Sequence, residues 1–179
     1  MDYLVPAIAV AGVMIATFII YVAMLPSAFR IERTAEIRAP AATIFPLIND
    51  LRNFNRWNPF AQSDPDAKID YSGPESGVGA AYDWSGTRSG AGRMKIATSR
   101  PASQVTMNLD FKRPCDAQNI AEFTLLPNGT STAVTWAMTG NRRFVHKLMG
   151  TLFNMDRMVG GEFSKGLNAL KAMAEARAD

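Results

Sequence analysis

Five segments of alternating apolar and polar residues, followed by one long amphipathic stretch, constrain the fold of this chain most. The alternating segments lie within residues 80–84, 92–98, 105–111, 121–125 and 132–138, with short turns between them. This pattern predicts an antiparallel meander with one wet face and one apolar face. From Phe144 to Met173 apolar residues recur every three or four positions, which predicts a long helix. Because a single sheet cannot bury its apolar face alone, we expect the sheet to curl around that helix.

The segments before the meander are shorter. Residues 29–38 alternate like a half-buried strand, and a helix is predicted to start at Pro40. Pro46 should shorten or kink that helix, and a second helical turn is expected at residues 51–54. Asn58-Pro59 is predicted to end the helical region, and residues 68–71 to form a short strand. In the long C-terminal helix, Gly160-Gly161 predicts a bend.

The N-terminus carries no charge over 23 residues, from Tyr3 to Leu25. A helix of that length could reach across a bilayer core, and the run is long for a cleaved signal peptide. We therefore predict a single-pass membrane anchor and linker over residues 1–28, followed by a folded domain over residues 29–176. Basic residues follow the anchor and none precedes it, which weakly favours a cytoplasmic domain. Two pairs of small residues could let another membrane helix approach the anchor: Ala7 with Ala11, and Gly12 with Ala16.

Composition excludes several kinds of site. The net charge is +3 and no run of Lys or Arg occurs, so no nucleic-acid surface is predicted. One cysteine and one histidine leave little for a metal or a catalytic triad, and no metal or cofactor is predicted. The remaining composition is ordinary for a globular protein.

Several stretches together resemble the START-like superfamily, and more narrowly its SRPBCC branch of polyketide cyclases/dehydrases and lipid-transport proteins. They are RTAEIRAPAATIFPLINDLRNFNRWNPF, YSGPESGVGAAYDWSG, GRMKI, TAVTWAMTG and LMGTLFNMDRMVGGEFSKGLNALK. The resemblance implies an α+β helix-grip fold, in which a seven-stranded antiparallel sheet grips the long C-terminal helix. It also implies an apolar cavity for a lipid, a polyketide or another hydrophobic small molecule.

In such a fold, residues on the apolar sheet face and the inward helix face would line the cavity, although each could equally be core. The candidates are Tyr82, Trp84, Met94, Met107, Leu109, Phe123, Trp136, Met155, Val159 and Phe163. The segment LRNFNRWNPF would close one end of the grip. Its aromatic residues Phe54, Trp57 and Phe60 would form either a gate to the cavity or a packed lid, while Asn55 and Asn58 would stay wet or cap turns.

Catalytic residues are hard to identify, and none is predicted. Asp156 and Glu162 lie off the apolar stripe of the long helix, His146 lies among cations, and Cys115 has no histidine partner nearby in sequence. Tyr82 is the one inward polar candidate.

The leading hypothesis is a membrane-anchored binding module for a hydrophobic small molecule or lipid. Two alternatives stay open. One is an accessory subunit of a larger membrane complex that uses the fold as a scaffold, and the other is a cyclase- or dehydrase-like enzyme.

Overall fold

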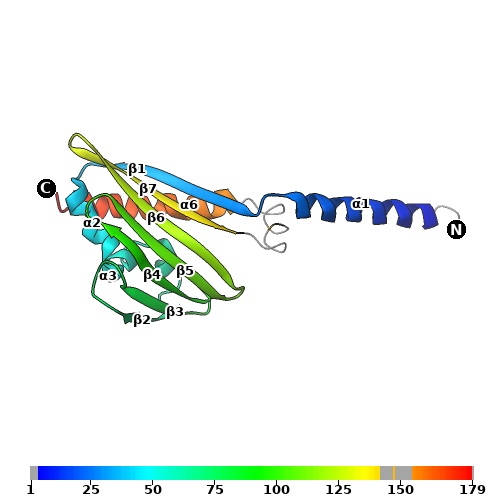
Figure 1. The fold of residues 1–179 in the computed structure, drawn as a ribbon, viewed down its shortest axis with the longest axis horizontal. Coiled ribbons are helices and arrows are strands. Elements are labelled where there is room, and N and C mark those ends of the chain that lie inside the picture. Colours follow the sequence, from blue (N-terminus) through cyan, green and yellow to red (C-terminus); the bar gives the residue numbers. More distant parts are fainter. Residues whose placement is uncertain (1–3, 142–146, 148–154, 179) are drawn as a thin grey trace.

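The computed structural model describes residues 4–141, 147 and 155–178. A long helix, α1 (Leu4–Met24), leads into strand β1 (Ala28–Ile37) and the short helices α2 (Ala41–Asn49), α3 (Leu51–Asn55) and α4 (Pro59–Gln62). Six strands follow: β2 (Lys68–Ser72), β3 (Ala81–Ser85), β4 (Ala91–Arg100), β5 (Gln104–Arg113), β6 (Ala117–Asn128) and β7 (Ser131–Asn141). The last helix is α6 (Met155–Glu175). Figure 1 shows α1 projecting from one end of the body formed by the other elements.

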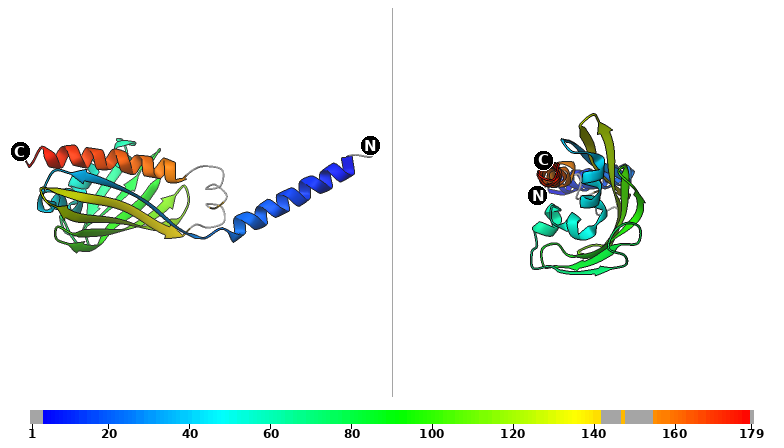
Figure 2. Two further views of the ribbon diagram at one scale, coloured as in Figure 1. Left: turned by 90° about the horizontal axis from the view of Figure 1, so that it is seen from above. Right: turned by 90° about the vertical axis from the view of Figure 1, so that its left-hand side faces the viewer.

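The seven strands form one antiparallel sheet in the order β1-β7-β6-β5-β4-β3-β2. Strands β2 to β7 pair in sequence order, and β1 pairs with β7, so β1 and β2 are the two edges of the sheet. Figure 2 shows the sheet curling around α2, α3 and α4 and the end of α6. The predicted α+β helix-grip fold, with seven antiparallel strands around a C-terminal helix, is therefore confirmed.

Polar contacts hold α6 against β1, an edge of the sheet. At the start of the helix, the Arg33 guanidinium donates to both carboxylate oxygens of Asp156, at 2.9 and 3.2 Å. At its other end, Glu175 accepts from the backbone N–H of Arg38 at 2.9 Å, and Lys171 Nζ donates to the Glu36 carbonyl at 2.8 Å. The helix therefore lies over one side of the concave face.

Gly160 and Gly161, where the sequence predicts a bend, lie within α6. Helix α6 continues through both glycines. A Cβ on Gly160 would lie 2.1 Å from Arg33 Nη2, whereas a Cβ on Gly161 would meet nothing within 4 Å. Gly160 thus makes room for the Arg33 side chain. The part of the predicted helix around Phe144 lies outside the described residues.

Helices α2, α3 and α4 close the far end of the sheet. Pro46 lies inside α2 and the helix ends three residues later, as predicted. The Asp50 side chain then caps α3 by accepting from two backbone N–H groups. The prediction that Asn58-Pro59 ends the helical region is wrong. Asn58 caps α4 and Pro59 takes its first position, where a missing N–H costs nothing.

The predicted membrane anchor and the single-pass, cytoplasmic placement are corrected by the structure. Among the described residues, no helix combines the length and the apolar character needed to cross a membrane. The accessory-subunit hypothesis used that anchor as its contact and receives no support.

Candidate ligand-binding site

The concave face divides into two regions, and the first is a cluster of packed rings near α3 and α4. We call it the closed end, and its members are Phe54, Trp57, Phe60, Phe123, Trp136 and Phe163. The Trp136 and Phe163 rings stack with centroids 4.2 Å apart and planes 10° apart, and the others meet mostly edge to face. All are buried except Phe60, which is 41% exposed. Rings packed in this way fill the space between sheet and helices at this end.

One polar atom in this cluster lacks a partner. Trp136 is 3% exposed, and its indole Nε1 has no hydrogen-bond acceptor among the described residues. The other two indoles donate to backbone carbonyls, Trp57 to Leu47 at 2.8 Å and Trp84 to Ser89 at 3.1 Å. A buried N–H without an acceptor carries a desolvation cost of about 1–3 kcal/mol.

The closing segment Leu51–Phe60 is a packed lid with a polar seam. Asn55 Nδ2 donates to the Tyr71 hydroxyl at 3.1 Å, and Asn58 Nδ2 reaches Asn55 Oδ1 at 3.4 Å. Both asparagines are buried, so the expectation that they stay wet is wrong, although Asn58 does cap a turn. These amides pair with one another, with the Tyr71 hydroxyl and with the backbone N–H of Phe60 at the start of α4, so their polar atoms are satisfied.

Tyr82 belongs to the same seam. Burial raises the pKa of the Tyr82 phenol well above its usual value, and side-chain hydrogen bonds with Asn55 and Asn58 oppose that rise only in part. The hydroxyl therefore stays protonated at neutral pH. Its role in the described structure is to join the lid to β3.

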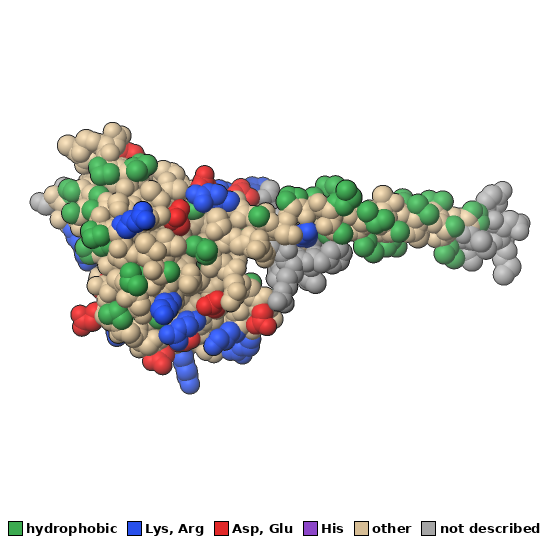
Figure 3. Space-filling model, in the orientation of Figure 1, with side chains coloured by type: hydrophobic (Ala, Val, Ile, Leu, Met, Phe, Trp, Pro, Cys, Tyr) green, Lys and Arg blue, Asp and Glu red, His purple; other side chains and the backbone are tan. Residues whose placement is uncertain are grey.

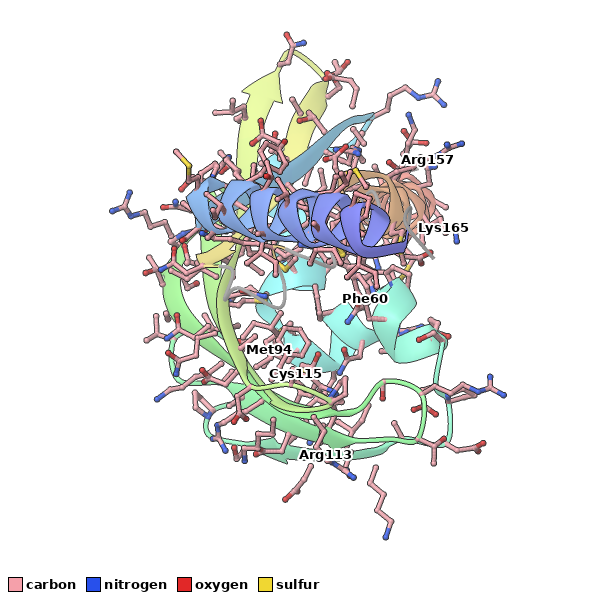
Figure 4. The ribbon with its side chains drawn as sticks, turned by 90° about the vertical axis from the view of Figure 1, so that its right-hand side faces the viewer. Phe60, Met94, Arg113, Cys115, Arg157 and Lys165 are labelled. Carbon is pink, nitrogen blue, oxygen red and sulfur yellow. The ribbon has the colours of Figure 1, made fainter. Side chains whose placement is uncertain are left out.

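The second region of the concave face lies at the end nearest α1, and we call it the open end. Its apolar side chains are only half-buried: Phe29, Trp84, Phe111, Met138 and Val159. In the same order, they come from β1, β3, β5, β7 and α6. In Figure 4, viewed from the α1 side, the sheet curves below the short helices, with Met94 labelled on β4 and Phe60 on α4.

Two glycines shape the open end. A Cβ on Gly92 would lie 2.4 Å from the Trp84 ring, and a Cβ on Gly140 would lie 2.1 Å from Asn119 Oδ1 and 2.9 Å from Phe29 Cε1. The Trp84 ring therefore packs against the backbone of Gly92, and Asn119 and Phe29 pack against that of Gly140. The half-buried side chains rest on backbone at these points, not on other side chains.

A hollow of about 900 Å³ adjoins the open end. It is lined by the ends of four neighbouring strands, through Ala28, Phe29, Arg30, Asn108, Asp110, Gln118, Asn119, Ile120, Thr139, Gly140 and Asn141. By strand alternation Phe29, Asn119 and Gly140 lie on the concave face and the others on the convex face. A second hollow, beside Arg52 and Tyr71, measures about 110 Å³. Ligand pockets commonly measure about 300–1,000 Å³, so only the first has the size of a ligand site.

The ten predicted cavity residues fall into three groups, and none lines either hollow. Seven are buried in the core: Tyr82, Met94, Met107, Leu109, Phe123, Trp136 and Phe163. Trp84 and Val159 are half-buried at the open end, and Met155 is exposed at the first position of α6. Four residues at this end were not predicted: Phe29, Phe111, Asn119 and Met138. They alternate in their strands just as the core residues do. Alternation does not show where along a strand the buried core ends, so the sequence pattern could not single them out.

The polar side chains considered for catalysis lie in ion pairs or in an exposed turn wherever the structure describes them. The hydrogen bonds from Arg33 lower the pKa of the Asp156 carboxyl, and Glu162 pairs with Lys165 at 2.7 Å. Cys115 is exposed in the turn between β5 and β6, and His146 lies outside the described residues. Within the described ranges no group of three or more His, Cys, Asp or Glu side chains could hold a metal ion.

The small residues predicted to contact another helix all fall within α1. The described side chains of α1 are exposed along most of its length, including Ala11 and Ala16, and Figure 3 shows apolar side chains on its visible face. Val22 is buried, and Lys147 Nζ donates to the Ala23 carbonyl at 3.2 Å.

A family model described as "Polyketide cyclase / dehydrase and lipid transport" matches residues 28–175. The chain belongs to this family. The match covers the whole sheet and all of α6, and it begins after α1 has ended. No curated protein matches the chain.

Solved structures share this polyketide cyclase/dehydrase and lipid-transport fold at low identity. A norcoclaurine synthase point mutant from Thalictrum flavum, in complex with a transition-state analogue, aligns with a TM-score of 0.64 at 14% identity, over 87% of this chain and 99% of that one. Protein MLL2253 from Mesorhizobium loti aligns at 0.60 and 16%, over 84% and 99%. DynU16, a putative protein in the dynemicin biosynthetic locus, aligns at 0.58 and 11%, over 83% of this chain and 48% of that one. At these identities the similarity shows the fold alone.

Proposed function

We propose that this protein is a binding module that holds a hydrophobic small molecule or lipid at the open end of its sheet. The observation that carries the proposal is the open end itself: apolar side chains there stay half-buried beside a hollow of about 900 Å³. Phe29 belongs to both, whereas most of the other residues that line the hollow are polar and lie on the convex face. Family membership agrees with a hydrophobic ligand.

The proposal moves the site from its predicted place. The buried sheet and helix positions predicted to line a cavity are mostly core, because rings close the far half of the concave face. Apolar surface that a ligand could cover remains where those rings stop. When a ligand covers half-exposed apolar surface, the binding free energy becomes more favourable by about 25 cal/mol per Å² of apolar area buried.

Two measurements test this proposal. Mass spectrometry of the protein purified under native conditions should reveal a co-purifying apolar molecule at a stoichiometric level. Titration with 2-ethylnaphthalene, followed by two-dimensional NMR, should shift resonances of Phe29, Phe111 and Met138 before those of the closed end.

A filled variant provides the control. Gly140→Leu brings its Cβ to 2.1 Å from Asn119 Oδ1 and 2.9 Å from Phe29 Cε1, so it displaces side chains of the open end and should weaken 2-ethylnaphthalene binding by about tenfold or more. Lys95→Leu adds a similar side chain on the exposed convex face of β4 and should leave binding unchanged. Equal affinities for the two variants and the unchanged protein would remove the site from the open end.

A further inference from the structure

The proposal starts from the one indole N–H that the described structure leaves unpaired. Among three tryptophans, Trp57 and Trp84 donate to backbone carbonyls, whereas Trp136 Nε1 has no acceptor although the residue is almost fully buried. Stacking on Phe163 and contact with the Phe123 ring at 5.0 Å fix the plane of the Trp136 indole. The N–H therefore cannot reach an acceptor by rotating.

The contacts of the Trp136 six-membered ring, at Cζ3, constrain where its N–H points. Trp136 Cζ3 lies against Gly166 and Pro59, where a Cβ on Gly166 would come within 2.7 Å of it. Gly166 lies further along α6, away from its start near α1. Nε1 is at the opposite edge of the indole from Cζ3, so it faces away from this contact.

Met138 is the side chain between Trp136 and the open end. It is the next residue on the concave face of β7, it is half-buried, and Asn119 Nδ2 contacts its sulfur at 3.8 Å. A hydrogen bond to a thioether is weak, and the unbranched methionine side chain changes rotamer easily. A ligand in the open end can thus reach the indole by displacing one flexible side chain.

We infer that Trp136 Nε1 is a ligand-recognition donor, and that the bound molecule is an apolar compound with a neutral acceptor oxygen, such as a carbonyl or ether. This inference rests on the proposed function. An acceptor at this place recovers the hydrogen bond that burial removed, whereas a pure hydrocarbon cannot. A neutral oxygen fits better than an anion, because the guanidinium of Arg33, paired with Trp136 across the strands, is already bonded by Asp156.

A matched pair of probes tests the inference on the whole chain. 2-Acetylnaphthalene and 2-ethylnaphthalene have similar size, and only the first carries an acceptor. NMR of the indole N–H groups should show that the acetyl probe shifts the Trp136 resonance downfield, while the resonance of Trp57 at the closed end serves as the internal reference. The ethyl probe should leave the Trp136 N–H shift nearly unchanged.

Trp136→Phe keeps a ring and removes the donor. It should weaken binding of the acetyl probe by about fivefold and leave the ethyl probe within about twofold, since one neutral hydrogen bond contributes about 1 kcal/mol. Trp84→Phe removes an N–H already bonded to the chain and should not separate the two probes. Should Trp136→Phe fail to fold, the indole shifts of the unchanged protein decide the question.

The outcomes separate the two proposals. Binding of both probes with no Trp136 shift, and with equal loss or no loss in Trp136→Phe, overturns the recognition role and leaves the binding module intact. If neither probe binds and no apolar molecule co-purifies, the proposed function fails and this inference fails with it.

Discussion

The two ends of the concave face are built from the same kinds of residue but are packed differently. At the closed end, rings from α3, α4, β6, β7 and α6 contact one another, and all but Phe60 are buried. At the open end, Trp84 lies over Gly92 and Phe29 over Gly140, and these rings and Met138 remain half-buried. The difference shows that one continuous apolar face can be a packed core over half its length and stay half-exposed over the other half.

The largest expected effect is the loss of a ring from the closed end. Phe123→Ala should lower the free energy of unfolding by about 3–5 kcal/mol, because neighbouring rings cannot collapse into the space. Chemical denaturation measures the change.

Phe111→Ala is the matched variant at the open end. Its ring is already half-exposed, so we expect a loss of about 1–2 kcal/mol. Equal losses for the two phenylalanines would mean that the two ends do not differ in packing.

A smaller effect is expected from adding one methyl group to α6. Gly166→Ala should destabilise the protein by about 1–3 kcal/mol, because its Cβ would lie 2.7 Å from the Trp136 ring and 2.9 Å from Pro59. Thermal unfolding followed by circular dichroism measures the change.

Gly161→Ala, five residues earlier, has open space at its Cβ and provides the control. There the better helix propensity of alanine should stabilise the protein by up to about 1 kcal/mol. A stable Gly166→Ala protein would show that the closed end is looser than its ring contacts indicate.

The smallest effect concerns pH and the turn that borders the open end. Asp64 accepts hydrogen bonds from the backbone N–H groups of Arg88 and Ser89, each at 2.9 Å, and these bonds lower the pKa of the Asp64 carboxyl. The contribution of this carboxylate is complete above its unfolded value near 3.8 and is lost as the pH falls through the lower folded value. Amide chemical shifts of Arg88 and Ser89 should therefore titrate below about pH 4.

Asp64→Asn provides the comparison for that titration. It removes the titrating group, so the two amide shifts should become independent of pH in this range. The indole N–H of Trp57, which bonds a backbone carbonyl at the closed end, should not respond in either protein. A response of Trp57 equal to that of Ser89 would indicate general acid unfolding instead of a local change.

The sequence predicts the fold better than the site, and particular residues show why. Alternation along β4 to β7 and the apolar period of α6 specify which side chains face inward, so the sheet and its covering helix follow directly. Alternation does not reveal how far along a strand the core extends. Trp136 and Met138 share a face and a period, yet only the first is fully buried. That difference depends on where α4 and α6 stop covering the sheet, which is a property of packing in three dimensions.

The polar contacts between α6 and β1 have a consequence for association between molecules. A sheet edge with free backbone groups can pair with a strand of another chain and so start aggregation. Here Lys171 bonds the carbonyl of Glu36 on that edge, and Glu175 bonds the N–H of Arg38 just beyond it. The opposite edge, β2, is only five residues long and carries Lys68 and Asp70. Both margins of the sheet are thus poorer templates for an added strand than a long edge with free backbone groups would be.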